Sequence, residues 1–328
     1  MHSPPVFADI EAAAERLRNV ALVTPVLESE AINDALGCRV LVKAECLQRT
    51  GAFKIRGAYN KIAGLGKAAR GRGVVAFSSG NHAQGVARAA RILDVDASIV
   101  MPADAPAIKI ANTKSDGARI VPYQRRDANR VEIAGEIAMR TGATLIPPYD
   151  DPEIIAGQGT IGLELARQAG ELGVRLDALL GPCSGGGMIG GTAIALSHLT
   201  PETEIYAVEP EGYDDWAISL AAGMRTPIKP EEASICDALL LEMPGELTFA
   251  VNRKLLSGAL TASDDAVRAA MRLAFDALKI VLEPSGAVGI AALLQQKSRF
   301  AGKTVAVIAT GGNVDRRLFA EIIGAEAG

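Results

Sequence analysis

The chain has 328 residues, of which 49% are hydrophobic, and its 34 basic and 38 acidic side chains give a formal net charge of −4. A chain of this length can build two domains around substantial cores. Both charge signs are scattered, which argues against a nucleic-acid-binding surface and a polybasic membrane patch, so the expected partners are small molecules and a second copy of the chain.

The N-terminus turns acidic and helical at once and lacks the pattern of a signal peptide. The most apolar stretch, residues 177–196, is interrupted by Pro182 and a glycine cluster, so it does not predict a membrane span. The cysteines form no CxxC pair, which argues against a disulfide scaffold and a zinc site. They are Cys38, Cys46, Cys183 and Cys236. We expect a protein of the reduced cytoplasm.

Short β-branched runs alternate with longer segments of helical period along the chain, a pattern typical of a parallel sheet wrapped by helices. The predicted strands span residues 39–45, 73–79, 97–102, 119–123, 144–148, 177–182, 204–210 and 303–310. The predicted helices include residues 82–93, 128–142 and 263–279. Ser263 is the expected N-cap of the last of these helices.

The loops that follow the strands are where a site is expected, because ligands of such sheets bind beyond the carboxyl ends of the strands. Three of these loops are unusual in composition: SSGNH (78–82), CSGGGMIGG (183–191) and TGGN (310–313). A fourth feature is GAFKIRGA, which places Lys54 beside Phe53 between small residues.

The glycine loop 183–191 exposes successive backbone N–H groups at a helix N-terminus, where unpaired donors and the helix dipole favour a phosphate. The alternative is that the glycines only allow the helix to pack closely on the sheet. Gly185, Gly187 and Gly190 also spell GxGxxG, and Glu209 ends the next strand, where an acid can bind a ribose. A nicotinamide-dependent oxidoreductase is therefore a competing interpretation.

The combination of the four features favours pyridoxal phosphate over a dinucleotide. The aldehyde of pyridoxal phosphate needs an amine to form a Schiff base, which Lys54 supplies. The phosphate needs backbone donors, and the ring needs polar partners for its 3′-oxygen and its nitrogen. The loops 78–82 and 310–313 supply such partners, whereas the dinucleotide interpretation gives these loops and Lys54 no role.

At this point the sequence resembles a known family, the fold type II pyridoxal-phosphate enzymes, and within it the threonine and serine dehydratase and serine racemase group. The resemblance covers residues 20–317 and rests on GAFKIRGA, SSGNHAQG, IAGQGTIGLE, SGGGMIGG, EPSGAV and TGGNVD, in the order of the family. It implies an α/β fold like that of the tryptophan synthase β subunit, with two open, twisted, mostly parallel sheets and helices on both faces. It also implies a homodimer, a large cofactor-binding domain (1–68 and 151–328) and a small mobile domain (69–150).

The resemblance also implies roles for individual residues. Lys54 would hold the cofactor as a Schiff base and, once displaced by substrate, move the Cα proton. Phe53 would pack on the pyridine ring, Asn81 would bind the 3′-oxygen, and Thr310 would face the ring nitrogen. The phosphate cradle is expected from Ser184, Gly185, Gly186, Gly187 and Met188.

The turn of Ser78, Ser79, Gly80, Asn81 and His82 would bind the substrate carboxylate through its N–H groups and hydroxyls. Ser79 resembles the residue that protonates the carbanion on the face opposite the lysine in serine racemases, and a hydroxyl that binds only carboxylate is the alternative. His82 is expected to be a packed or capping histidine rather than a general base.

A second implied site is a divalent metal site. Glu209, Asp215 and the backbone carbonyl of Tyr213 match the spacing of metal ligands in serine racemases and related dehydratases. Hard oxygen donors suit Mg²⁺, Mn²⁺ or Ca²⁺. Such a metal would be structural or activating, and a solvated acidic turn is the alternative.

The expected reaction follows from the partner of the ring nitrogen. The neutral hydroxyl of Thr310 does not keep that nitrogen protonated as a carboxylate would, which favours prompt loss of a β-substituent over transamination. We expect dehydration and deamination of a 3-hydroxy amino acid such as L-threonine or L-serine, giving a 2-oxo acid and ammonia. A 3-hydroxyaspartate dehydratase, which shares the Gly-Ala-Phe-Lys variant, and a serine racemase are the alternatives. Tyr149 occupies a position near the substrate side chain that varies within the group.

Overall fold

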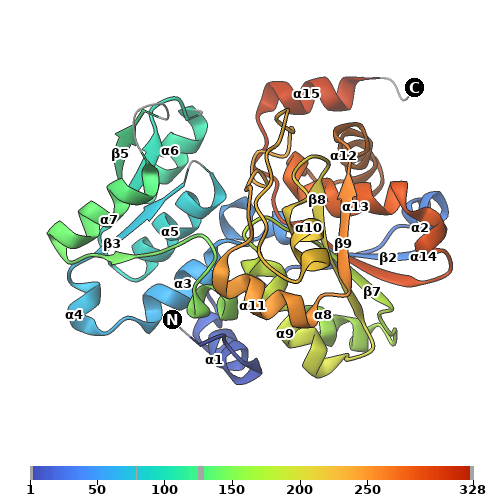
Figure 1. Ribbon diagram of the computed structural model, residues 1–328, viewed down its shortest axis with the longest axis horizontal. Helices are drawn as coiled ribbons and strands as arrows, with labels where there is room; N and C mark the ends of the chain where they lie inside the picture. The colour runs from blue at the N-terminus through green and yellow to red at the C-terminus, as the bar shows by residue number, and fades with distance from the viewer. Residues whose placement is uncertain (1–2, 79, 106, 125–128, 326–328) are drawn as a thin grey trace.

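The computed structural model describes residues 3–78, 80–105, 107–124 and 129–325. Its strands form two sheets with helices packed around them (Figure 1). The larger sheet has the order β1 (Val26–Leu27), β2 (Arg39–Lys43), β10 (Thr304–Ile308), β7 (Ala178–Pro182), β8 (Glu204–Pro210) and β9 (Gly258–Ala262). The smaller sheet has the order β5 (Arg119–Tyr123), β4 (Ala97–Pro102), β3 (Val74–Phe77) and β6 (Thr144–Leu145). Neighbouring strands are parallel except for β1, which runs antiparallel to β2.

All eight predicted strands are present, and the described residues form two further strands that the sequence does not predict. The predicted strand 144–148 is wrong beyond Leu145, because Pro147 and Pro148 lack the N–H group that a ladder requires. The unpredicted strands are β1, with two residues, and β9, whose sequence GALTA has little strand propensity. Pairing with β8 along its whole length holds β9 in the extended conformation.

The three predicted helices correspond to α5 (Asn81–Ile92), α7 (Arg130–Thr141) and α12 (Asp264–Leu278). Ser263 caps α12 as predicted, since its hydroxyl accepts a hydrogen bond from the Ala266 N–H at 3.3 Å. The other helices are α1 (Phe7–Leu17), α2 (Glu30–Leu36), α3 (Ile55–Gly64), α4 (Lys67–Arg70), α6 (Ala107–Ser115), α8 (Pro152–Glu171), α9 (Gly187–Leu199), α10 (Asp215–Ala222), α11 (Glu246–Leu255), α13 (Pro284–Gln295), α14 (Lys297–Phe300) and α15 (Arg316–Gly324), with 3-10 turns at Glu45–Leu47 and Arg49–Gly51. Among the described residues, no helix is both long and apolar enough to cross a membrane.

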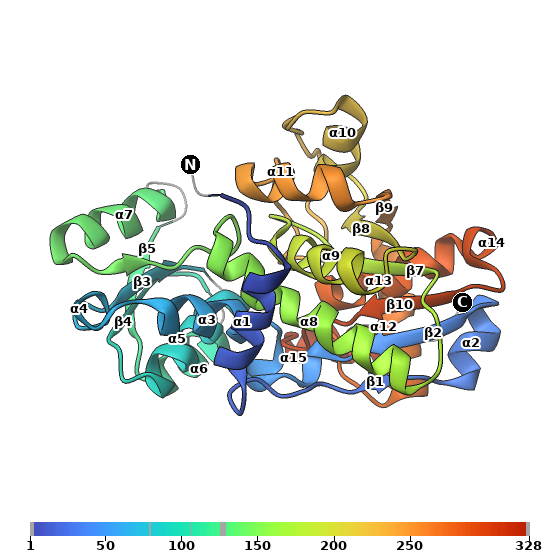
Figure 2. The same ribbon diagram turned by 90° about the horizontal axis from the view of Figure 1, so that it is seen from below.

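Helix α8 packs closely against α3 on one side and α9 on the other, and Figure 2 shows it beside α9 and α1. The glycines of the IAGQGTIGLE motif make this possible. A Cβ at Gly157 would lie 2.7 Å from the Cα of Gly57, and a Cβ at Gly162 would lie 2.8 Å from the Thr192 carbonyl oxygen. Because α3 begins just after Lys54 and α9 begins within the glycine loop, α8 fixes the separation of these two parts of the site.

A buried ionic cluster ties α3 to the larger sheet two residues beyond Lys54. Arg56 Nε donates a hydrogen bond to Glu45 at 2.8 Å, and Arg56 Nη1 donates one to Glu164 at 2.7 Å. The Lys43 ammonium also donates to Glu164, at 2.6 Å. Burial by itself would raise the pKa of Glu45, but Arg56 and Lys43 hold that pKa below its ordinary value. Losing one partner would leave a buried charge uncompensated, a change that typically costs about 3–5 kcal/mol.

The two sheets use separate parts of the chain. The strands of the smaller sheet lie between residues 74 and 145, and those of the larger sheet lie outside that interval. The expected domain boundaries at residues 68/69 and 150/151, and the mobility of the smaller domain, stay predictions.

Candidate active site

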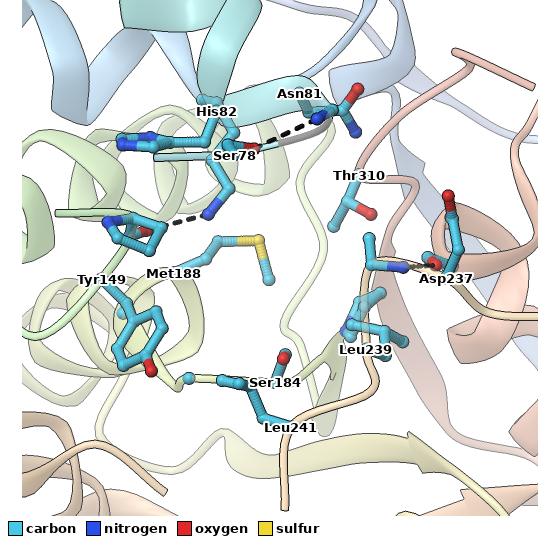
Figure 3. A pocket seen from close by; sticks show the side chains of 18 of the residues that line it. Ser78, Asn81, His82, Tyr149, Ser184, Met188, Asp237, Leu239, Leu241 and Thr310 are labelled. Carbon is cyan, nitrogen blue, oxygen red and sulfur yellow. Dashed lines mark hydrogen bonds between the residues drawn. The ribbon is translucent and has the colours of Figure 1, made fainter. Parts of the chain in front are cut away.

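A cavity of about 360 Å³ lies where the carboxyl ends of β3, β7 and β10 converge from the two sheets. It brings together the residues predicted to bind cofactor and substrate: Phe53, Lys54, Ser78, Gly80, Asn81, His82, Ser184, Gly185, Gly186, Gly187, Met188 and Thr310. Ser79 lies outside the described residues. In Figure 3, Asn81 and His82 lie on one side of the cavity and Ser184 lies across from them.

Lys54 stands at the start of α3, with its side chain on the cavity wall. Its Nζ donates a hydrogen bond to the Pro148 carbonyl at 2.9 Å and lies 5.0 Å from the centroid of the Phe53 ring. Burial lowers the pKa of Lys54 to about 8, against the opposing attraction of Glu283. A larger fraction of neutral amine is therefore present near neutral pH, and the neutral amine is the form that attacks an aldehyde.

The glycine loop before α9 points a row of N–H groups toward the cavity. Side chains behind the loop hold its carbonyl groups: Trp216 Nε1 donates to Ser184, Thr248 Oγ1 donates to Gly185 at 2.6 Å, and Asn252 Nδ2 donates to Gly186 at 3.0 Å. In a trans peptide the N–H points opposite to the C=O. The N–H groups of Gly185, Gly186 and Gly187 therefore point away from these side chains, as a bound phosphate requires.

Gly186 is the residue at which the loop most clearly requires glycine. Its φ is +84°, and a Cβ there would lie 2.8 Å from Asn252 Nδ2 and would overlap the Trp216 ring. Close packing and the direction of the N–H groups are thus two aspects of the same arrangement, because the side chains packed behind the loop hold its carbonyl groups. The residues present therefore fit the phosphate of pyridoxal phosphate.

The amide of Asn81 is held in one orientation by two neighbours. Its oxygen accepts from Asn313 Nδ2 at 2.8 Å, and its nitrogen donates to Glu283 Oε1 at 2.6 Å. Burial raises the pKa of Glu283 to about 7, and the charge of Asp237 adds to the rise. These two bonds fix the orientation of the Asn81 amide at the cavity wall, and Thr310, buried two residues after β10, also lines the cavity.

The turn between β3 and α5 is arranged around the start of α5. The Ser78 hydroxyl accepts from the Gly80 N–H at 3.1 Å, and the unpaired N–H groups of the first turn of α5 can bind an anion. His82 donates through Nε2 to the Ile146 carbonyl at 2.9 Å. Burial, and then the charge of Lys54, lower the pKa of His82 to about 3, so this histidine is neutral at physiological pH.

Four charged residues to which the sequence analysis gave no role also line the cavity: Lys109, Arg130, Asp237 and Glu283. Lys109 Nζ lies 3.0 Å from Asp237 Oδ2 and links α6 of the smaller sheet to the loop after residue 236. Lys109 and Arg130 belong to helices whose sequence pattern is that of ordinary surface helices. One local signal is available: Arg130 is in the first turn of α7, where a cation is unfavourable.

Glu209 and Asp215 do not line the cavity. They lie buried together behind the glycine loop, where burial and their mutual repulsion raise the pKa of Glu209, and burial raises the pKa of Asp215 to about 7. The two Glu209 oxygens accept from the N–H groups of Trp216 and Ala217 at 3.0 and 3.2 Å, and Glu209 lies outside the cavity, so it is not placed to bind a ribose there. Asp215 Oδ2 is buried without a hydrogen-bond partner. The described part of the chain contains no cluster of three or more His, Cys, Asp or Glu side chains suited to a metal.

Comparison with known proteins gives consistent matches over nearly the whole chain. The family model described as "Pyridoxal-phosphate dependent enzyme" matches residues 17–311. The chain is 42% identical to the L-threo-3-hydroxyaspartate ammonia-lyase of Saccharomyces cerevisiae, over 97% of this chain and 96% of that protein. It is 39% identical to the serine racemase of Schizosaccharomyces pombe, over 97% of both chains. The crystal structure of the threonine deaminase of T.th. superposes with a TM-score of 0.90 at 43% identity, covering 95% of this chain and 99% of that one.

The lowered pKa of Lys54 predicts how fast the apoenzyme captures pyridoxal phosphate. The capture rate should rise about tenfold per pH unit below pH 8 and level off above it, because only the neutral amine reacts. Stopped-flow absorbance between pH 6 and 10 measures this rate, with Lys54→Ala as the control for reaction at other amines. A midpoint near 10.5, the ordinary value for lysine, would contradict the assignment.

The loop geometry predicts that Gly186→Ala weakens pyridoxal phosphate binding by at least about 100-fold. The added methyl group would displace Trp216 and Asn252, and the N–H groups that these side chains orient would then point away from the phosphate. Gly117→Ala is the matched control, with a φ of +86° and no heavy atom within 4 Å of the added Cβ. It carries the same backbone strain and should leave the affinity unchanged. Equal losses of affinity in the two variants, measured by fluorescence titration, would argue against the cradle.

Proposed function

The chain belongs to the family of pyridoxal-phosphate dependent enzymes, and on this basis we propose that it dehydrates and deaminates a 3-hydroxy amino acid to a 2-oxo acid and ammonia. The observation that carries the proposal is the placement of the Lys54 amine in one cavity with the N–H row of the glycine loop. The relatives named above include an ammonia-lyase of 3-hydroxyaspartate and a threonine deaminase. Family membership also sets aside the nicotinamide interpretation of the GxGxxG match.

The residues that would hold the cofactor come from both sheets. The N–H groups of the glycine loop would bind the phosphate, the Asn81 amide would donate to the 3′-oxygen, and Thr310 would face the ring nitrogen. Phe53, beside Lys54 in the cavity wall, would pack on the ring. When bound, pyridoxal phosphate withdraws electrons from the substrate Cα and makes the Cα proton acidic.

Lys54 is the base that we propose for this proton. Its side chain lines the cavity. Because its pKa is about 8, both the neutral and the charged amine are present near neutral pH. The substrate carboxylate would bind at the start of α5, opposite the loop that holds the phosphate. The neutral hydroxyl of Thr310 favours loss of the β-hydroxyl as water over transamination.

Closure of the smaller domain, residues 69–150, would complete this site. Asn81 in α5 and Lys109 in α6 belong to this smaller domain. Asn81 donates a hydrogen bond to Glu283, and Lys109 donates one to Asp237, and both acceptors belong to the larger domain. We propose that these contacts form as the domain closes over substrate and excludes water.

The proposed activity is tested by 2-oxo acid release from L-threonine, L-serine and the 3-hydroxyaspartate isomers by the holoenzyme. Release from at least one substrate should fall by more than about 1000-fold in Lys54→Ala, because both the anchor and the base are lost. Lys114→Ala, on the exposed side of α6, is the control and should keep full activity. Exchange of enantiomers without any 2-oxo acid would instead identify a racemase.

We also propose that Glu209, Asp215 and the Tyr213 carbonyl bind Mg²⁺, Mn²⁺ or Ca²⁺. Two buried carboxyl groups lie against each other, and one oxygen of Asp215 has no hydrogen-bond partner within the described structure. The oxygen donors suit a hard cation. The cation would stabilise the packing behind the glycine loop, because Trp216 follows Asp215 and holds the Ser184 carbonyl.

The metal proposal predicts a pH-dependent stabilisation. With the pKa of Asp215 raised from 3.8 to about 7, the cation-free protein should lose stability as the pH rises between these values. At pH 8 a saturating cation should raise the melting temperature by about 3–6 °C, the effect of a ligand at roughly 100 times its Kd. Asp215→Asn should abolish the response, and Glu211→Gln, an exposed neighbour, should retain it. An equal response in both variants would place the cation elsewhere.

The homodimer and a racemase side activity through Ser79 stay proposals that rest on the resemblance. The four cysteines are free and buried, which fits a reduced compartment. Light scattering of the purified enzyme would test the dimer, whose mass would be twice the 34.1 kDa of the chain.

A further inference from the structure

Helix α11 begins without a side chain of its own to cap it. Its N-cap residue is Gly245, which has no side-chain oxygen to accept from the first N–H groups of the helix. The acceptor is Asp150, 96 positions before the first residue of α11. Asp150 Oδ2 accepts from the Glu246 N–H at 3.1 Å, and Asp150 Oδ1 accepts from the Thr248 N–H at 3.0 Å. Asp150 therefore does for α11 what an N-cap side chain ordinarily does.

The glycine at position 245 is what permits this approach. A Cβ there would lie 2.5 Å from Asp150 Oδ1 and 2.6 Å from Thr248 Oγ1, which is closer than Cβ atoms come to such neighbours. The φ of Gly245 is −62°, a value that any residue adopts. Glycine is therefore required here by the contact with Asp150 and Thr248, and not by the backbone conformation.

The residue that Asp150 binds also orients the glycine loop. The Thr248 N–H donates to Asp150, and the Thr248 hydroxyl donates to the Gly185 carbonyl at 2.6 Å. One turn further along α11, Asn252 Nδ2 donates to the Gly186 carbonyl at 3.0 Å. Because the C=O and N–H of a trans peptide point in opposite directions, these two bonds direct the N–H groups of the residues that follow. A shift of the first turn of α11 would change that direction.

The two residues before Asp150 contact the same site from the side of the lysine. The Pro148 carbonyl accepts from Lys54 Nζ at 2.9 Å, and the Tyr149 ring lies where a side chain at position 185 would project. Figure 3 shows the Tyr149 ring at the edge of the cavity, below the end of the lysine side chain. Three consecutive residues thus connect the amine, the glycine loop and the helix that holds the loop.

The charge of Asp150 argues against a direct role in binding an anion. A carboxylate beside an anion site weakens that site by repulsion. Burial, and then the charge of Asp150, raise the pKa of Tyr149, whose ring borders the glycine loop. Asp150 itself does not line the cavity. Its contribution to the site is the placement of other groups.

We infer that Asp150 is a positioning residue for the cofactor phosphate: by capping α11 from the segment before α8, it holds Thr248 and Asn252 against the carbonyl groups of the glycine loop. The inference rests on the proposed function, in which this loop takes the phosphate. It makes the strength of the phosphate site depend on a residue at the expected domain boundary, 150/151, that touches neither cofactor nor substrate.

Comparison of pyridoxal phosphate with pyridoxal, which lacks the phosphate, is the first test. The ratio of their Kd values for the apoenzyme, measured by fluorescence titration, gives the contribution of the phosphate to binding. This contribution should fall about 10-fold in Asp150→Ala, the effect of a lost cap, while the Kd of pyridoxal stays unchanged. Asp150→Asn keeps an oxygen that accepts from the Thr248 N–H and should retain most of the contribution.

Asp315→Ala is the matched control. Asp315 caps α15 by accepting from the N–H groups of Arg317 and Leu318 at 2.8 and 3.2 Å, so the variant removes a carboxylate cap of the same kind. Helix α15 contributes no residue to the cavity. The control should lower the melting temperature and leave the contribution of the phosphate unchanged.

Gly245→Ala is a second, independent variant, and it keeps the Asp150 side chain. The added Cβ would displace the Asp150 carboxylate from the start of α11, so the contribution of the phosphate should again fall about 10-fold. This variant carries the test if Asp150→Ala does not fold.

A double-mutant cycle tests whether Asp150 acts through Thr248. Thr248→Val removes the hydroxyl that binds the Gly185 carbonyl and keeps the backbone N–H. If the two side chains act in series, the loss in the double variant should equal the larger of the two single losses and not their product.

Three outcomes would overturn the inference in distinguishable ways. Equal weakening of pyridoxal phosphate and pyridoxal in Asp150→Ala would assign Asp150 to the lysine end of the site, through Pro148. Losses that multiply in the cycle would show that Asp150 and Thr248 act independently. A lower melting temperature with both affinities unchanged would leave Asp150 with a role in stability alone. By contrast, a failure of the proposed function would appear as no 2-oxo acid from any substrate, whatever the ratio of affinities.

Discussion

The orientation of three peptide groups in the glycine loop is the constraint on which the rest of the site depends. Trp216, Thr248 and Asn252 hold the carbonyl groups of residues 184–186 from behind, so the N–H groups of the following residues point toward the cavity. In the proposed function this loop would bind an anion through its N–H groups and the dipole at the start of α9. The glycines allow these three side chains to approach the loop closely, and the side chains set the direction of its N–H groups.

The lysine is placed opposite this loop by helix packing rather than by the loop itself. Helix α8 separates α3 from α9 at contact distances that only glycine permits, and the Arg56 cluster anchors α3 to the larger sheet. Burial at that position lowers the pKa of Lys54 to about 8 and prepares the amine for its proposed chemistry. One packing arrangement thus fixes both the position and the reactivity of the amine.

The helices beside the smaller sheet contribute polar and charged side chains to the cavity. Its helices carry Asn81, held in place by Glu283 and Asn313, together with Lys109 and Arg130. Because these groups face the glycine loop across the cavity, the anions of cofactor and substrate would have separate binding groups in the proposed function.

The sequence by itself determined the alternation of strands and helices, the loops that carry chemistry, and the lysine, because these features follow from local periodicity and from unusual composition at strand ends. Only the tertiary structure placed Glu283 and Asn313 on Asn81, Thr248 and Asn252 behind the glycine loop, and Arg130 in the cavity. The hydrogen bonds that Glu283, Asn313, Thr248 and Asn252 make join residues more than 60 positions apart, as between Asn81 and Glu283, and they leave no local pattern in the chain. Strand β9 was missed for the same reason: its conformation comes from pairing with β8 and not from its own residues.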